Sequence, residues 1–318
     1  MKIPETPPDT TKTFNKVLKD NDSEKISKFL NWIQPTDAKG RYLHWDKLRH
    51  LNPPEGWTVK EWWAAIKFAR GKLHRKIDLL DVNQNPFVYA TPDCIQKDLH
   101  ELAKNAAGNL TSNKEIINPD LRKTYLIRSL INEAINSSQL EGAATTRNVA
   151  KEMIRQGSKP KNTSEQMIKN NFLAMQFITD IKEEPLTPSI IIELHKILTQ
   201  NTLKKEESAG KFRTEEDEII VVDPLDGALL HTPPKSDELP ERIEKLCRFA
   251  NEEDPQVFIN PLVKAIILHF ALAYDHPFVD GNGRTARALF YWFAARQGYD
   301  LIQFSSISKV LKDEPGKY

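Results

Sequence analysis

Apolar residues recur at helical spacing along most of this 318-residue chain. Stretches in which every third or fourth residue is apolar predict helices that turn one face to a core. Two of these helices have clear start signals, because Thr58 and Thr187 can each cap a first turn and Pro188 suits the first helical position. The predicted helices span residues 22–33, 59–73, 92–104, 119–140, 163–183, 187–199, 239–252, 260–274 and 285–297.

One region has the pattern of β-strands. Apolar runs at residues 218–222 and 228–231 flank a turn that contains Pro224 and Gly227, which is typical of a hairpin. A two-stranded hairpin has little stability of its own, so we expect it to lie over a site as a flap. The pattern therefore predicts a mainly α-helical fold with one hairpin.

The composition is that of a folded globular protein, with 39% hydrophobic and 28% charged residues. The formal net charge of +1 gives no strong field, so neither a nucleic-acid partner nor a membrane partner is expected. The longest apolar stretch, residues 265–274, is shorter than the roughly 20 residues that a membrane span needs. Cys94 and Cys247 have no metal-ligand spacing, and we expect a cytoplasmic protein with reduced thiols.

The segment from His276 to Arg287, HPFVDGNGRTAR, holds the densest chemistry of the chain. Gly281 and Gly283 permit close approach of the backbone just before a predicted helix, whose first amides can bind an anion. Arg284 and Arg287 lie three residues apart on that helix, and a guanidinium suits phosphate oxygens. The segment predicts a phosphate-binding loop; the plainer alternative is a tight turn followed by two surface arginines.

His276 and Asp280 add reactive groups to this loop. Pro277 disfavours helical geometry at His276, which places the imidazole on the loop. Its ordinary pKa of about 6.5 suits a proton acceptor at neutral pH. Mg²⁺ takes one or two protein carboxylates and completes its shell with phosphate oxygens, so Asp280 is a candidate ligand. An acidic residue that only favours the helix start is the alternative. Phe278 is expected to anchor the loop by burial.

The segment resembles, at every specified position, the signature of the Fic (filamentation induced by cAMP) family: His, any residue, Phe, any residue, Asp or Glu, Gly, Asn, Gly, Arg, any two residues, Arg. The resemblance implies a Fic-type helical bundle that transfers AMP from ATP to a protein Ser, Thr or Tyr hydroxyl. It also implies a role for each residue: His276 as the base, Asp280 as the Mg²⁺ ligand, Gly281, Asn282, Gly283 and the catalytic Arg284 as the phosphate cradle, and Arg287 on the γ-phosphate.

A second segment, Ser137-Ser138-Gln139-Leu140-Glu141-Gly142, ends the predicted helix 119–140. Ser137 and Glu141 share one face, and a glutamate at a helix C-terminus is unfavourable unless it has a partner. The segment resembles the inhibitory motif that precedes the core in one class of Fic proteins: Ser or Thr, any three residues, Glu, then Gly or Asn. The resemblance implies that Glu141 competes with ATP for Arg287; an ordinary helix end is the alternative.

The resemblance extends to the flap and to the domain organisation. It implies that Leu230, His231 and Thr232 bind an extended target segment by strand addition, and we assign Tyr291 to the nucleotide pocket. We expect a helical N-terminal extension over residues 1–110 and a Fic domain over residues 111–318. That domain includes the inhibitory helix, residues 119–142.

Three interpretations of the function follow. The first is an autoinhibited protein adenylyltransferase (an AMPylator) that uses ATP and Mg²⁺ and modifies a hydroxyl-bearing protein, itself included. The second is a de-AMPylating hydrolase in which Glu141 orients a water molecule, and the third is a nucleotide-binding regulatory or interaction module with vestigial catalysis. The motif does not define the group that is moved, and homo-oligomer formation is left open.

Overall fold

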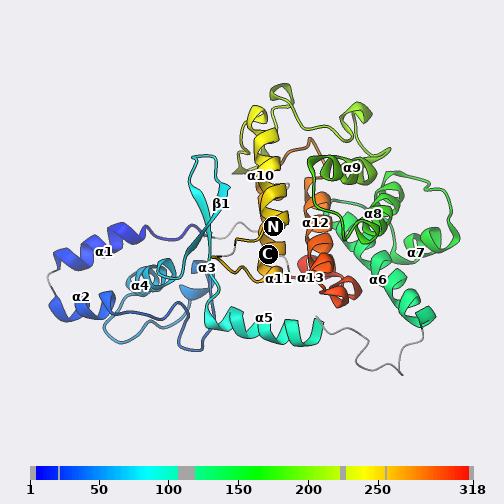
Figure 1. Ribbon diagram of the computed structural model, residues 1–318. Coiled ribbons are helices and arrows are strands. Elements are labelled where there is room, and N and C mark those ends of the chain that lie inside the picture. The colour runs from blue at the N-terminus through cyan, green and yellow to red at the C-terminus, as the bar shows by residue number, and fades with distance from the viewer. Residues whose placement is uncertain (1–4, 21, 107–118, 223–226, 255, 315–318) are drawn as a thin grey trace. The chain divides into compact units, whose positions relative to one another are not determined.

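The computed structural model describes residues 5–20, 22–106, 119–222, 227–254 and 256–314 (Figure 1). They form two compact units. The larger unit comprises Asp78–Asn85 and the described residues from Leu102 on, and the smaller unit comprises the described residues up to Ile77 together with Pro86–Glu101. The predicted boundary between residues 110 and 111 lies outside the described residues. Within the described residues, no helix combines the length and the apolar character that a membrane span requires.

The smaller unit is built around α4 (Val59–Gly71). Thr58 caps this helix as predicted and forms a capping box with Glu61: the Glu61 amide donates to Thr58 Oγ1, and the Thr58 amide donates to the Glu61 carboxylate. Trp62 and Trp63 are buried in an aromatic core, so these aromatic side chains of α4 serve in packing. The other helices that begin in this unit are α1 (Thr10–Lys19), α2 (Ser23–Leu30), α3 (Trp45–Leu48) and α5 (Asp93–Ala106).

The prediction of a single hairpin is wrong. Strands β1 (Arg75–Leu80) and β2 (Pro86–Tyr89) form a further two-stranded sheet. Their turn is held by Asp81, whose carboxylate accepts hydrogen bonds from the amides of Asn83 and Asn85 at 2.8 Å each. An aspartate that bonds to the backbone of its own turn is a recognised turn signal, and it stands here between two short apolar runs.

Helix α12 (Asn282–Arg296) lies at the centre of the larger unit, with α11 on one side and α8 and α9 on the other (Figure 1). Its apolar residues Leu289, Trp292 and Phe293 are buried. Around it stand α6 (Pro119–Leu140), α7 (Arg147–Gln156), α8 (Thr163–Asp180), α9 (Pro188–Thr199), α10 (Leu239–Asn251), α11 (Pro261–Asp275) and α13 (Ile307–Asp313), with short 3₁₀ turns at Glu206–Ser208, Glu215–Asp217, Ser236–Glu238 and Asp300–Phe304.

The predicted hairpin is confirmed as an antiparallel pair, β3 (Val221–Val222) and β4 (Leu229–His231), in which Val221 lies opposite His231. It is shorter than predicted, and residues 223–226 of its turn lie outside the described residues.

Helices α1, α3, α7 and α13 have no counterpart among the predicted elements. They are short, and each buries only one or two side chains. Helix α12 begins three residues before its predicted start at residue 285, because Gly281 serves as its N-cap residue.

Candidate active site

The loop between α11 and α12 is closed by the side chain of Asn282. The Phe278 amide donates to Asn282 Oδ1 at 2.9 Å, and Asn282 Nδ2 donates to the Phe278 carbonyl at 2.7 Å. The Phe278 ring is fully buried, as predicted. Since the amide of the Asn282 side chain is committed to the loop, its backbone amide is the group that remains for a phosphate.

Gly281 turns the chain into α12. Its φ of +83° is a conformation that L side chains rarely adopt, and a Cβ there would lie 2.8 Å from the methyl carbon of Thr199. The backbone therefore passes close beneath α9 and enters α12 at once. The first amides of a helix have no intrahelical acceptor, so this loop presents a cluster of free donors.

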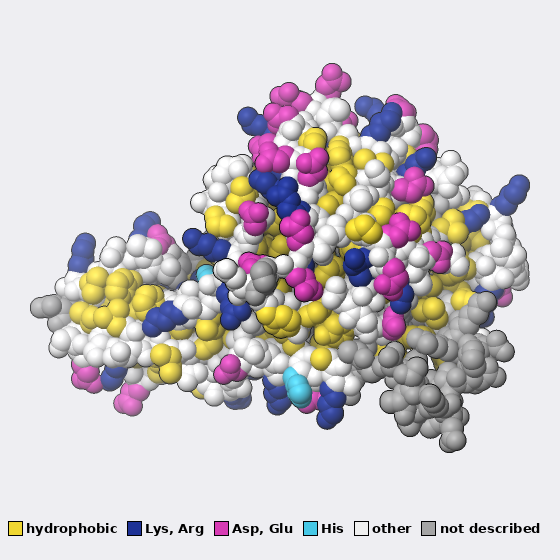
Figure 2. Space-filling model, viewed as in Figure 1, with side chains coloured by type: hydrophobic (Ala, Val, Ile, Leu, Met, Phe, Trp, Pro, Cys, Tyr) yellow, Lys and Arg dark blue, Asp and Glu magenta, His cyan; other side chains and the backbone are white. Residues whose placement is uncertain are grey.

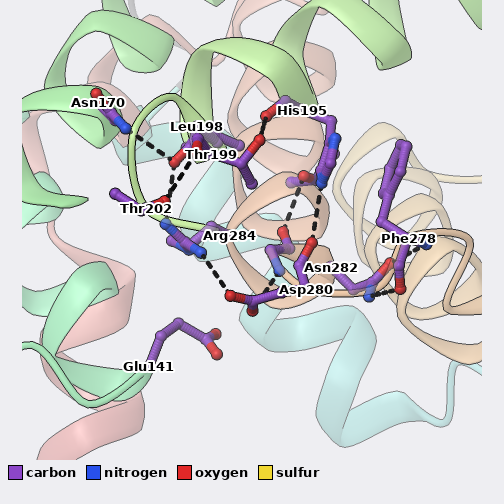
Figure 3. A network of polar contacts seen from close by, with 12 residues as sticks. Glu141, Asn170, His195, Leu198, Thr199, Thr202, Phe278, Asp280, Asn282 and Arg284 are labelled. Atoms are coloured by element: carbon purple, nitrogen blue, oxygen red, sulfur yellow. Dashed lines mark hydrogen bonds and ion pairs between the residues drawn. The ribbon is translucent and has the colours of Figure 1, made fainter. Parts of the chain in front are cut away.

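His195 on α9 supports the loop from the other side, and the sequence analysis missed it (Figure 3). Its Nδ1 accepts from the Gly210 amide at 3.0 Å, so its Nε2 carries the proton and donates to the Asp280 carbonyl at 2.9 Å. Burial lowers the pKa of His195 to about 4, which keeps the ring neutral. The ring also stacks on Phe278, with centroids 3.7 Å apart. The sequence feature that could have indicated His195 is a histidine placed among the apolar residues of a predicted helix.

His276 ends α11 in a left-handed conformation, with φ 45° and ψ 56°. The helix stops at this residue as predicted, but the extended geometry expected before Pro277 is not the one observed. Arg213 holds the strained backbone: its Nε donates to the His276 carbonyl at 2.8 Å, and its amide donates to the Pro277 carbonyl at 2.9 Å. Strain of this kind persists only where surrounding contacts enforce it, and it is frequent at functional sites.

The imidazole of His276 is half-buried and keeps one ring nitrogen as an acceptor. Burial lowers its pKa below 6.5, and the charges of Arg213 and His231 act in the same direction. One ring nitrogen is hydrogen-bonded to the Ala273 carbonyl. A neutral imidazole has a single N–H, which that carbonyl occupies, so the other nitrogen is an acceptor at neutral pH.

Arg284 is buried, with an exposed fraction of 1%, and joins α9 to the loop. Its Nη1 donates to the Leu198 carbonyl at 3.0 Å, and its Nη2 lies 3.7 Å from Asp280 Oδ2 (Figure 3). Its Nε has no hydrogen-bond partner among the described residues. An unpaired buried donor is costly unless a ligand supplies an acceptor, so this atom fits an anion.

Asp280 cannot hold a metal ion by itself. Its side chain is 58% exposed, and one carboxylate oxygen accepts from the Gly281 amide at 2.6 Å. Across the described ranges, no group of three or more His, Cys, Asp or Glu side chains is suited to a metal. A single exposed carboxylate fits Mg²⁺ that arrives with phosphate oxygens in its shell.

Arg287 is occupied from within the chain. Its Nη2 donates to Glu141 Oε1 at 2.7 Å and to the Ser137 carbonyl at 3.1 Å, and its Nε donates to Ser137 Oγ at 2.9 Å. A Cβ on Gly283 would lie 2.3 Å from Glu141 Oε1, so the carboxylate rests directly against the first turn of α12. An anion is favoured at that position, and the Glu141 carboxylate fills part of it (Figure 3).

The flap is anchored beside His276. The ring nitrogen Nε2 of His231 lies 2.7 Å from the Tyr274 carbonyl, two residues before His276, while Leu230 and Thr232 are exposed. Arg213 also donates to the Pro234 carbonyl at the end of the flap. One arginine therefore contacts both the strained loop and the flap.

Tyr291 is separate from this cluster of side chains. Its residue is 1% exposed, its hydroxyl donates to the Ser305 carbonyl at 2.9 Å, and it accepts from the Ile307 amide at 2.8 Å. With the ring buried and the hydroxyl committed, no part of Tyr291 is open to a nucleotide in this structure. Its assignment to the nucleotide pocket has no support here.

Among proteins of known sequence, a protein adenylyltransferase Fic from Nematostella vectensis is 32% identical over 118 residues, which cover 37% of this chain and 25% of that protein. A protein adenylyltransferase fic-1 from Caenorhabditis briggsae is 26% identical over 223 residues, which cover 70% of this chain and 41% of that protein. The chain therefore spans less than half the length of these two curated relatives.

Solved structures show the same fold. A Fic-domain-containing signalling protein from Bacteroides thetaiotaomicron has a TM-score of 0.50 and 26% identity, over 64% of this chain and 73% of that one. A Fic family protein from Desulfovibrio desulfuricans has a TM-score of 0.54 and 20% identity, over 71% of this chain and 64% of that one. Residues 185–294, which include His195, the flap and the loop before α12, match the family model Fic/DOC.

Proposed function

We propose that this chain is an autoinhibited protein adenylyltransferase, which transfers AMP from ATP to a Ser, Thr or Tyr hydroxyl of a protein target. Relatives named for this activity are similar to this chain over 118 and 223 residues, and the Fic/DOC match at residues 185–294 includes the loop, the flap and His276. The buried and unpaired Nε of Arg284 and the free amides of α12 support a bound phosphate.

In this proposal, His276 accepts the proton of the target hydroxyl through its free ring nitrogen. The hydroxyl oxygen then forms a bond to the α-phosphorus of ATP, the bond to the β-phosphate bridge breaks, and pyrophosphate leaves. Arg284 and the first amides of α12 stabilise the charge on the transferred group. Asp280 would hold Mg²⁺, which neutralises phosphate charge when bound. Positioning and charge neutralisation account for most of the catalysis in such a site.

The observation that carries the autoinhibited form is the pair between Glu141 and Arg287, at 2.7 Å against the first turn of α12. The γ-phosphate of ATP and the Glu141 carboxylate are both negatively charged, and both suit the guanidinium of Arg287. The two anions therefore compete for Arg287, and in the unmodified chain the Glu141 carboxylate occupies it.

The test compares self-labelling by ATP that carries a label on the α-phosphate. Glu141→Gly frees Arg287 and should raise labelling well above that of the unmodified chain, and adding His276→Ala should abolish it. If the Glu141→Gly form incorporates no label in the presence of Mg²⁺, the nucleotide or the direction of the reaction is wrong.

A second candidate is a de-AMPylating hydrolase, favoured by the fixed position of the Glu141 carboxylate beside the anion site, where its side chain remains 30% exposed. A carboxylate there can orient a water molecule. This function predicts AMP release from a modified target, and the release should be lost in Glu141→Gly. A nucleotide-binding module with vestigial catalysis would instead bind ATP without turnover in either variant.

A further inference from the structure

The side of α6 on which Ser137 lies also carries a buried acid, Glu133, one turn nearer the start of the helix. Glu133, Ser137 and Glu141 follow at four-residue spacing, which aligns them along one side. Glu133 has an exposed fraction of 2%. Its carboxylate accepts hydrogen bonds from the Ser306 hydroxyl at 2.9 Å, the Ser308 amide at 3.2 Å and the Ser308 hydroxyl. A buried carboxylate that accepts three hydrogen bonds is held firmly in place.

All three donors belong to the segment Phe304–Lys312, which we call the C-terminal clasp. Its further contacts reach α6 at Ser129, Asn136 and Gln139, the last of which stands two residues before Glu141 in the chain. They are Ser129 Oγ to the Phe304 carbonyl at 2.9 Å, Asn136 Nδ2 to Ser306 Oγ at 3.1 Å, and Lys312 Nζ to Gln139 Oε1 at 2.7 Å.

The clasp also holds α12, through Tyr291. Tyr291 lies one turn after Arg287, and its hydroxyl bridges the Ser305 carbonyl and the Ile307 amide. Burial and the charge of Glu133 raise the pKa of Tyr291 well above its ordinary value, so the hydroxyl stays protonated. The clasp therefore fastens α6 to α12 one turn away from the pair between Glu141 and Arg287.

We propose that the C-terminal clasp sets how firmly Glu141 occupies the anion site, and that Glu133 is the positioning residue through which it acts. The inference rests on the proposed role of Glu141 as a brake. Glu141 stands just beyond the last turn of α6, so its carboxylate meets Arg287 only when the end of that helix is held in place. Loss of the Glu133 acceptor leaves buried serine donors unpaired and releases that end.

The test substitutes Glu133→Gln, which keeps the side-chain shape and places an amide among donors. The affinity for ATP with Mg²⁺ is measured by calorimetry in a His276→Ala background, where the proposed transfer cannot occur. We expect ATP to bind about three- to tenfold more tightly, a factor equivalent to about 0.7–1.4 kcal/mol. In a chain that also carries Glu141→Gly, the same substitution should leave the affinity unchanged. Hydrogen exchange at the end of α6 should accelerate in both backgrounds.

Glu61→Gln is the matched control. Glu61 is also a buried carboxylate, 8% exposed, that accepts from a backbone amide, but it lies in the smaller unit. Its substitution should not change ATP affinity. The inference is overturned if Glu133→Gln changes the affinity by the same factor with and without Glu141, or leaves it unchanged while Glu141 is present.

The two proposals fail in different ways. If Glu141→Gly alone does not tighten ATP binding, there is no brake for the clasp to hold, and both proposals fall. If Glu141→Gly tightens binding but Glu133→Gln does not, only the clasp fails. Should Glu133→Gln not fold, Lys312→Ala removes the exposed contact to Gln139 and spares the buried carboxylate. It should produce a smaller gain in the same direction, and an unchanged affinity would refute the clasp.

Discussion

His276 makes the proposed chemistry dependent on pH. Burial lowers its pKa below 6.5, so the ring remains an unprotonated acceptor somewhat below that pH and is lost as a base when the pH falls through the lowered value. We expect the labelling rate of the Glu141→Gly form to be flat near neutrality and to fall on the acid side, with a midpoint below 6.5. A midpoint above 6.5 in the pH–rate profile would contradict the role given to this ring.

His195 should affect stability instead. Its pKa falls to about 4 in the fold, against about 6.5 in the unfolded chain, so the unfolded state binds more protons between these values. The stabilisation that the neutral His195 gives to the folded state is therefore fully present above pH 6.5 and declines as the pH falls toward 4. In urea unfolding experiments, the His195→Gln variant should have a lower free energy of unfolding at pH 7. That free energy should also depend less on pH between 4 and 6.5. Some pH dependence of the unfolding free energy should remain in this variant, because the pKa of His269 is also lowered to about 4.

Among the elements, the entry into α12 provides a test of the loop geometry. Gly281→Ala adds both backbone strain and a clash with the Thr199 methyl, whereas Gly298→Ala adds strain alone, since a Cβ on Gly298 would meet nothing within 4 Å. Both variants should lose about 1 kcal/mol or more of unfolding free energy, with the larger loss at Gly281. Adding Thr199→Ser removes the methyl and should recover part of that difference. Equal losses in the two single variants would argue against the close passage under α9.

The sequence predicted the elements that have strong local signals and missed those that depend on distant contacts. The Thr58 capping box and the start of α9 at Pro188 follow from neighbouring residues alone. The left-handed backbone of His276 depends on Arg213, which is 63 residues away along the chain. The contact of His195 with the Asp280 carbonyl likewise arises only when α9 packs on the loop. No pattern of spacing contains these contacts.

For the molecule as a whole, the charge pattern and the long-range pair between Glu141 and Arg287 are the informative features. On the visible face, acidic and basic side chains are interspersed, in keeping with the net charge of +1 (Figure 2). The family match covers residues 185–294, but the contact between Glu141 and Arg287 joins residues 146 positions apart and begins outside that range. The segment that ends at Glu141 was found through its resemblance to a known motif, because its partner cannot be deduced from spacing.

Occupation of the anion site should be visible in the stability of the whole chain. A ligand that binds only the folded state stabilises it according to its concentration relative to Kd. With saturating Mg²⁺, a fixed ATP concentration should therefore raise the Tm of Glu141→Gly more than that of the unmodified chain. The comparison is made in the His276→Ala background to prevent turnover. Equal Tm shifts would mean that Glu141 does not compete with ATP.

The most direct measurement is the covalent labelling of the Glu141→Gly chain by ATP labelled on either the α- or the γ-phosphate, with intact mass as a second readout. Adenylyl transfer predicts that the α-label alone enters the protein, that the mass rises by one AMP group, and that His276→Ala removes both signals. Incorporation of the γ-label, or no incorporation of either label with Mg²⁺ present, would contradict the proposed function.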